Sequence, residues 1–521
     1  MISTEKEANG MKQSPVIKHI GTALLLGGIV GAVTGAVITL YKLCAKHAVH
    51  LAEEGYDLFR HRLLWLVAAV AVLIAVAGIL TLIYRRTSNL RGGGIPTAIG
   101  MIRGWIPVRW VRNAVGVWVL SLSSFLMGLP LGTEGPSVQL GTTLGKGCSQ
   151  LLGKRGEAWG RYGMTGGACA GFSTATGAPL SGILFAVEEA HNRISPLILI
   201  VAAAAVAVSR LVSDLLAPVL NVSSTLFPAL ELRSMNLQDL WIPVALGVVM
   251  GLFAVLFLSF HRQMSHLLNH KLAKVPHFYK ILAFLLLTLG FGWLSVSYVS
   301  TGHELILHLF NGESIVLLVM ILLVRTTLTV GTNVSGITGG IFLPLMAIGA
   351  TVASLFAQVA TNLGLDESYY AVILVLGITA CIAGMMKMPL TAIAFAVEAL
   401  SGADIILPIL LVVGVTYGLT EWLGAVSIND RVLDSYMEKI NEGRKVVVDE
   451  LSLTVQPGSF ADGKEIRDIL WPDGLFVLAV DKQRAEGSHA LHGGDRLQVR
   501  YTTRFEDRLK TELTAIVGEQ T

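Results

Sequence analysis

Two carboxylates lie in stretches that otherwise carry almost no charge. Glu134 lies within GLPLGTEGPSVQLGTTLG, residues 128–145, and Glu189 is the second carboxylate of VEEAHNR, residues 187–193. A carboxylate in an apolar setting is costly, so one that persists there often serves ions or protons. Such a side chain can carry a proton and can also occupy a site meant for a small anion. The two residues therefore raise proton transfer and anion binding as hypotheses.

Each carboxylate also has a purely structural interpretation. Glu134 is equally compatible with a helix cap at a wet membrane edge, because acidic residues favour the first turn of a helix. Glu189 is compatible with an interfacial position at a helix end, paired with Arg193 one turn further on. Spacing alone leaves both interpretations open.

Three glycine-rich turns lead into predicted helices, at GGGIP 92–96, GTEGP 132–136 and GGIFLP 339–344. The first N–H groups of a helix have no partner inside it, and the helix dipole adds partial positive charge at that end. Neutral dipoles of this kind can replace the water around an anion without holding it too tightly. The turns therefore predict an anion site.

The composition predicts that these groups lie in a membrane. Of 521 residues, 53% are apolar and only 14% are charged, and the mean hydropathy is +0.65. Residues 63–83 form an uncharged run that matches the roughly 20 helical residues needed to cross the hydrocarbon layer. Further apolar runs occur near 22–41, 111–129, 196–217, 239–259, 281–297, 315–330, 341–362, 367–385 and 404–423. A net charge of +3 predicts no nucleic-acid partner.

Two pairs of similar segments indicate an internal repeat. APLSGILFAVEEA at 178–190 resembles MPLTAIAFAVEAL at 388–400, and the difference between prolines 389 and 179 is 210. Pro136 and Pro344, which follow two of the glycine turns, differ by 208 positions. We therefore expect repeats at about 18–217 and 235–440, with the substrate site between broken helices at their interface.

Both ends of the chain differ from this apolar body. Residues 1–17 form a polar segment before a retained first span, and three arginines at 84–91 favour an inside location for the N-terminus. From residue 445 to 521 the chain alternates short apolar runs with turn signals, which predicts a soluble, strand-rich domain that ends in a helix near 504–517.

The combination of GGGIP, GTEGP and GIFLP, with the flanking SVQLG and LFAVEEA, resembles the signature of the CLC family of chloride channels and chloride/proton antiporters. The resemblance covers about residues 18–440. It implies an all-α polytopic membrane protein built as an inverted repeat of about eighteen helices, and a homodimer with one anion pore in each subunit. With the tail, the expected fold also includes a small α+β soluble domain.

The resemblance also implies site residues. Glu134 corresponds to the external gating glutamate, Glu189 to the internal proton-transfer glutamate, and Glu188 to its more structural neighbour. The implied anion-binding positions are Gly93, Thr133, Gly135, Ile341, Phe342, Leu343 and Asn429.

Three of these positions depart from the family pattern. Many members have Ser at position 93, Lys or Arg at 133 and Tyr at 429, where this chain has Gly93, Thr133 and Asn429. Two side-chain donors to the central anion are thus missing or altered. The departures predict a weaker central anion site.

The tail resembles the C-terminal ligand-binding module of Trk-type potassium-uptake regulators, through GK-x-I, LxxPDG and HGGDxLxV. This resemblance implies regulation by a small ligand. The alternative is a stabilising or dimerising domain, with His492 and Asp495 of HGGD in a solvent-exposed turn.

The leading hypothesis is a secondary active antiporter of the cell (inner) membrane that exchanges chloride, or a similar monovalent anion, for protons, with cytoplasmic termini. A passive anion channel and, because of the tail, a regulated cation transporter are the alternatives.

We expect no enzymatic activity, no cofactor and no metal. In HELILH, 303–308, the two histidines are five positions apart, too divergent on a helix for one metal, and the four cysteines form no CxxC pair. Lys387 and Glu398 are expected at helix ends or in polar pockets.

Overall fold

The computed structural model describes residues 15–61, 63–153, 156–191, 195–441 and 445–520. Most of the polar segment 1–17 and the residue Arg193 therefore lie outside the described residues.

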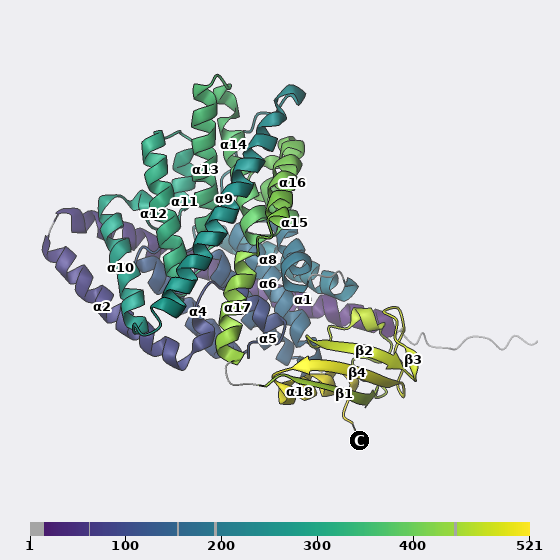
Figure 1. The fold of residues 1–521 in the computed structure, drawn as a ribbon. Coiled ribbons are helices and arrows are strands. Elements are labelled where there is room, and N and C mark those ends of the chain that lie inside the picture. Colours follow the sequence, from purple (N-terminus) through teal and green to yellow (C-terminus); the bar gives the residue numbers. More distant parts are fainter. Residues whose placement is uncertain (1–14, 62, 154–155, 192–194, 442–444, 521) are drawn as a thin grey trace, which may run out of the picture.

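Helices form the body of the molecule, in two successive halves (Figure 1). The first half contains α1 (Pro15–His61), α2 (Leu63–Arg86), α3 (Ile95–Ile102), α4 (Trp110–Leu126), α5 (Glu134–Gln150), α6 (Gly156–Thr176), α7 (Pro179–Phe185), the π-helical turn η3 (Ala186–His191) and α8 (Pro196–Val219). The second contains α9 (Trp241–His266), α10 (His277–Leu294), α11 (His303–Leu309), α12 (Ile315–Val334), α13 (Phe342–Asn362), α14 (Tyr370–Cys381), α15 (Pro389–Ala399), α16 (Ile406–Trp422) and α17 (Ile428–Asn441).

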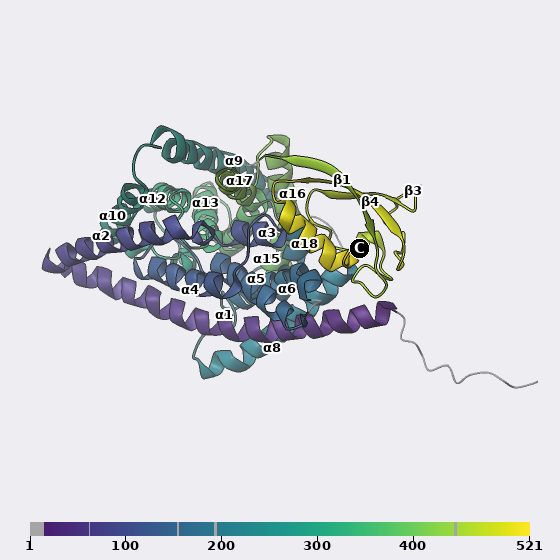
Figure 2. The same cartoon turned by 90° about the horizontal axis from the view of Figure 1, so that it is seen from below.

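Nine helices in the described part of the chain are long and apolar enough to cross a membrane. They confirm the predicted apolar runs, with two differences. The run near 111–129 forms α4, whose 17 residues fall short of a typical full crossing. Helix α1 continues to His61, far beyond the run at 22–41, and lies along one side of the molecule (Figure 2).

Glycines let α5 approach α6 closely. A Cβ added at Gly141 would collide with the backbone of Gly167, and one at Gly145 would collide with Gly163. Small residues on facing helices allow their backbones to touch, which is how helices in membranes commonly gain packing contacts. Replacing any of these four glycines would push α5 and α6 apart.

The tail forms one antiparallel sheet and one helix. Its elements are β1 (Val447–Thr454), β2 (Leu475–Val480), β3 (Gln483–Arg484), β4 (Arg496–Thr503) and α18 (Glu506–Val517), in the sheet order β1-β4-β2-β3. Leu497, Val499 and Tyr501 alternate with exposed residues along β4 and share a core with Leu513 of α18. The predicted strands and final helix are confirmed, and His492 is exposed as expected.

The tail packs against the helical body, with α18 beside α6 and α3 (Figure 2). Arg161 of α6 donates to the carbonyl of Trp471 at 2.9 Å and pairs with Glu512 of α18 at 2.7 Å. Arg508 of α18 donates to the carbonyl of Gly104, just after α3, at 2.8 Å. These contacts join the tail to α6 and to the end of α3, both of which contact the turn that carries Glu189.

Candidate functional site

The three predicted glycine turns meet at one place. Gly132 and Gly340 exchange two backbone hydrogen bonds, with N···O distances of 2.6 and 2.9 Å. Gly94 has a φ of 71°, and a Cβ added there would collide with the backbone of Gly135. Only glycine allows this approach and this φ without strain. The N-termini of α3, α5 and α13 therefore converge.

Helices α5 and α13 begin in the same way. Thr133 and Ile341 are the N-cap residues, and Pro136 and Pro344 occupy the third helical position in each. Proline has no N–H group, so it is tolerated in the first turn, where N–H groups lack partners inside the helix. This leaves the amides of Glu134, Gly135, Phe342 and Leu343 as the first-turn donors, at the positions predicted for the anion.

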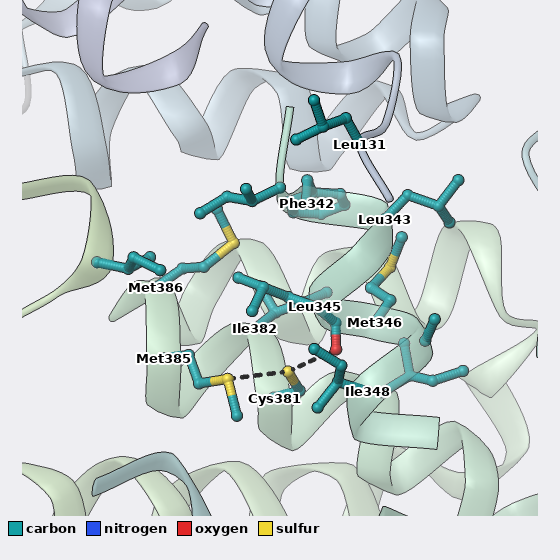
Figure 3. Packing of buried hydrophobic residues seen from close by; sticks show 14 of the residues in the cluster. Leu131, Phe342, Leu343, Leu345, Met346, Ile348, Cys381, Ile382, Met385 and Met386 are labelled. Carbon is teal, nitrogen blue, oxygen red and sulfur yellow. Dashed lines mark hydrogen bonds between the residues drawn. The ribbon is translucent and has the colours of Figure 1, made fainter. Parts of the chain in front are cut away.

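The beginning of α13 rests on a dense apolar layer (Figure 3). Phe342 and Leu343 are buried above α14 and the residues that follow it. Cys381 donates from Sγ to the carbonyl of Leu345 at 3.0 Å and lies 3.5 Å from Met385 Sδ. All four cysteines are free, and this one packs within the apolar layer.

Glu134 is fully buried at the junction of α5 and α13. Its Oε1 accepts a hydrogen bond from Thr133 Oγ1 at 3.1 Å, and the backbone amides of Glu134 and Leu343 face the carboxyl group. Oε2 has no hydrogen-bond partner among the described residues. The carboxyl group therefore occupies the space between two helix N-termini, where a small anion would also be favoured.

Glu189 lies in the turn η3 and is almost completely buried. Its Oε1 accepts from Asn429 Nδ2 of α17 at 2.8 Å, and Arg103 donates to the carbonyls of Glu189 and Ala190 at 3.1 and 3.4 Å. Asn429, predicted as an anion ligand, thus has its amide nitrogen on this carboxyl group. The alternative partner Arg193 lies outside the described residues.

Glu188 and Glu398 cap helices in opposite halves of the chain. Glu188 accepts from the amides of Leu390 and Thr391, both at 2.8 Å, at the start of α15. Glu398 accepts from the amides of Leu180 at 2.7 Å and Ser181 at 3.0 Å, at the start of α7. Each carboxylate therefore completes a helix of the other half.

A cavity of about 1,150 Å³ leads to the GGGIP turn from the side where α17 continues into the tail. Gly92, Pro96, Asn333 and His261 are among its lining residues. The fixed charges on its wall are mainly positive, with Arg85, Arg91, Arg262, Lys280 and Arg431 against Asp434 and Glu438. Such a surface concentrates anions.

The other sites considered from the sequence are structural. His303 stacks on Phe227 and its Nε2 lies 2.8 Å from the carbonyl oxygen of Leu226, while His308 pairs with Glu313 at 2.6 Å. Lys387 contacts Thr420 and Glu421 at a helix end. The described residues contain no group of three metal-ligating side chains.

Residues 76–421 match the sequence profile of the family described as voltage gated chloride channel, which is about two thirds of the chain. The chain belongs to this family. A member from Vibrio parahaemolyticus serotype O3:K6, named H(+)/Cl(-) exchange transporter ClcA, is 27% identical over 413 residues, covering 75% of this chain and 84% of the relative. The protein of the same name from Klebsiella pneumoniae (strain 342) is 26% identical over 438 residues, covering 80% and 89%.

Solved structures show the same fold. A slow cyanobacterial Cl-/H+ antiporter superimposes with a TM-score of 0.69 at 24% identity, covering 80% of this chain and 99% of that one. A CLC-type fluoride/proton antiporter gives 0.61 at 18% identity, covering 77% and 95%. This member of the voltage-gated chloride channel family therefore has the CLC fold with a small C-terminal sheet domain added.

The sequence did not predict two further residues of the candidate site, Asn333 and His261. Asn333 is buried beside Gly93, and the buried His261 contacts Asn333 at 3.1 Å. The available signal was a polar residue within the apolar helix 315–334, since polar groups at membrane depth usually serve a function.

Proposed function

We propose that this chain is a secondary active antiporter, which exchanges chloride or a similar monovalent anion for protons across a membrane. One observation carries the proposal: the buried carboxyl group of Glu134 lies between the N-termini of α5 and α13, in the position that suits an anion. A carboxylate and a chloride ion cannot share that position. When Glu134 takes up a proton, its side chain loses its negative charge and the amides become available to chloride.

The same event links the two ions. A proton taken up by Glu134 opens the anion position, and chloride leaving that position lets the carboxyl group release its proton and return there as a carboxylate. Exchange requires a second proton acceptor on the far side of the anion site. Glu189 is suited to this role, because its carboxyl group is buried and its Oε1 accepts a hydrogen bond from Asn429.

The basic cavity supports an anion as the ion that enters from the side of α17. Five Arg and Lys residues and four His residues line it, against two acidic residues. Neutral amide dipoles beyond it replace the hydration shell without trapping the ion. A cation would meet an unfavourable potential at both places.

Reconstitution tests the proposal directly. The purified protein is placed in liposomes loaded with chloride, and chloride efflux and external pH are recorded together. We expect chloride leaving down its gradient to draw protons into the liposomes against theirs. Chloride efflux without proton movement would establish a channel instead, and potassium flux without either would establish a cation pathway.

We further propose that the protein lies in the cell (inner) membrane as a homodimer, with cytoplasmic termini and with the tail as a regulatory module for a small ligand. The first turns of α1 and the tail lie on one face, because the rings of His19 in α1 and Phe460 in the tail are 6.1 Å apart. Labelling of cysteines introduced at His19 and in the tail, in intact and in permeabilised cells, tests this placement. Reaction of both residues only after permeabilisation is expected, and reaction in intact cells would reverse the orientation.

A further inference from the structure

Asn333, near the end of α12, has a buried amide nitrogen with an unfilled hydrogen-bonding capacity. The residue is only 5% exposed, and Nδ2 has no hydrogen-bond partner among the described residues. The other half of the amide is satisfied, because Oδ1 lies 3.1 Å from Nε2 of the buried His261. A buried N–H donor without a partner is costly, so this one is expected to have a ligand.

The unpartnered nitrogen lies at the glycine turn that opens α3. A Cβ added at Gly93 would lie 3.3 Å from Asn333 Nδ2. Asn333 and Gly92 both line the basic cavity. The amide nitrogen thus occupies the region that a side chain at position 93 would enter.

His261 determines which end of the amide faces this region. The carboxamide oxygen can only accept, so the contact is a hydrogen bond donated by Nε2–H of His261 to Oδ1 of Asn333. With the oxygen held on that side, the N–H₂ group points away from His261. His261 acts here as a positioning residue.

We propose that Asn333 donates a hydrogen bond from Nδ2 to the transported anion, and so supplies from α12 the side-chain donor that Gly93 lacks. The inference rests on the proposed function, since it assigns a further ligand to the same anion path. A carboxamide N–H donor carries no fixed charge, so it adds a directed contact without the strong retention that Lys or Arg would give.

The geometry also bears on the expectation that the anion site is weak because position 93 lacks a serine. A serine there would bring its side chain against the Asn333 amide, so the two donors compete for one space. Gly93→Ser alone is therefore expected to change chloride affinity little. In a background without the amide, the same substitution is expected to restore affinity.

The test is a double-mutant cycle measured by calorimetric titration of chloride into the purified full-length protein. Asn333→Leu keeps the approximate size of the side chain and removes the donor, and the dissociation constant for chloride is expected to rise about 10- to 100-fold, as for loss of one hydrogen bond to a charged group. Gly93→Ser in the Asn333→Leu background is expected to recover most of that loss. Asn113→Leu is the control, because Asn113 is also buried with an unpartnered Nδ2 among the described residues but does not line the cavity.

The outcomes separate the two proposals. If the unmodified protein neither binds chloride nor moves it in liposomes, the proposed function fails. If it does both and Asn333→Leu binds chloride within twofold of it, or more tightly, the assignment of Asn333 is overturned.

His261 provides an independent variant if Asn333→Leu does not fold. His261→Leu is expected to weaken chloride binding because the amide can turn. His261→Gln, which retains an N–H donor for Oδ1, is expected to restore it. Equal binding by the two His261 variants would also overturn the assignment.

Discussion

The two halves of the chain agree in some of their acidic side chains and differ in others. With the 210-residue offset of Pro179 and Pro389, Glu188 corresponds to Glu398, and each caps a helix of the opposite half. With the same offset, Glu189 corresponds to Ala399. The capping acids are thus duplicated, whereas the acid that contacts Asn429 occurs once.

The glycine turns show the same contrast. With the 208-residue offset of Pro136 and Pro344, Glu134 corresponds to Phe342, whose ring packs edge-on against Phe172 and Phe395. One half places a carboxylate between the helix N-termini, and the other places an aromatic ring in an apolar layer. Duplication therefore marks the carboxylates that hold the scaffold, and asymmetry marks those proposed to carry protons.

The largest effect is expected at Glu134. Glu134→Gln keeps the shape of the side chain but cannot release a proton or become an anion, so chloride-driven proton uptake should disappear while chloride flux remains. Parallel recording of chloride and pH in liposomes measures both. If this variant still pumps protons uphill, Glu134 is only a helix cap and its asymmetry has no functional meaning.

A selective effect is expected at Glu189, the second acid that has no acidic counterpart in the other half. Glu189→Gln can still accept a hydrogen bond from Asn429, but it cannot accept and pass on a proton. Chloride flux should persist, and the ratio of protons to chloride should fall severalfold or more. Proton uptake at the unmodified rate would mean that another route carries protons from the inner side.

Smaller and matched effects are expected for the duplicated acids. Glu188→Ala and Glu398→Ala each remove a carboxylate that accepts from two backbone amides, so each should lower the free energy of unfolding by about 1–2 kcal/mol. Denaturation of the purified variants measures this loss. The ratio of protons to chloride should be unchanged in both, and loss of proton uptake in Glu188→Ala alone would place Glu188 with the functional acids.

The smallest effect on transport is expected for a buried titratable side chain that belongs to neither half. Lys464 of the tail lies against the rings of Phe460 and Trp159, and burial lowers its pKa to about 6. The unfolded tail, with a pKa near 10.5, binds more protons between these values, so the stability of the folded tail should rise from about pH 6 to about pH 10.5.

Lys464→Met removes this group and should flatten the pH dependence without changing transport. Thermal unfolding of the full-length protein, followed by tryptophan fluorescence between pH 6 and pH 9, compares the variant with the unmodified chain. An unchanged slope in the variant would show that Lys464 is not the titrating group.

The sequence predicted the parts of the site that depend on local chemistry. The glycine turns, the prolines after them, the repeat and the tail strands all have signals within a few residues. The contacts that depend on distant segments had no such signal. No residue near Asn333 in the sequence indicates that Gly93 lies beside it. The spacing of the repeated segments did not indicate that Glu188 and Glu398 each cap a helix of the opposite half. The family resemblance predicted Asn429 at the anion site, but it gave no signal for the hydrogen bond that its Nδ2 donates to Glu189.

The helix caps that Glu188 and Glu398 provide across the two halves also constrain the order in which the protein folds during synthesis. The acceptor for the first amide of α7 lies 218 residues further along the chain. At ordinary synthesis rates that interval lasts about 10–40 s. An uncapped helix end is costly wherever water is absent, so the first half is expected to wait in a partly inserted state until the second half is translated. A ribosome that stalls before residue 398 would therefore leave a product for membrane proteases rather than half of a working protein.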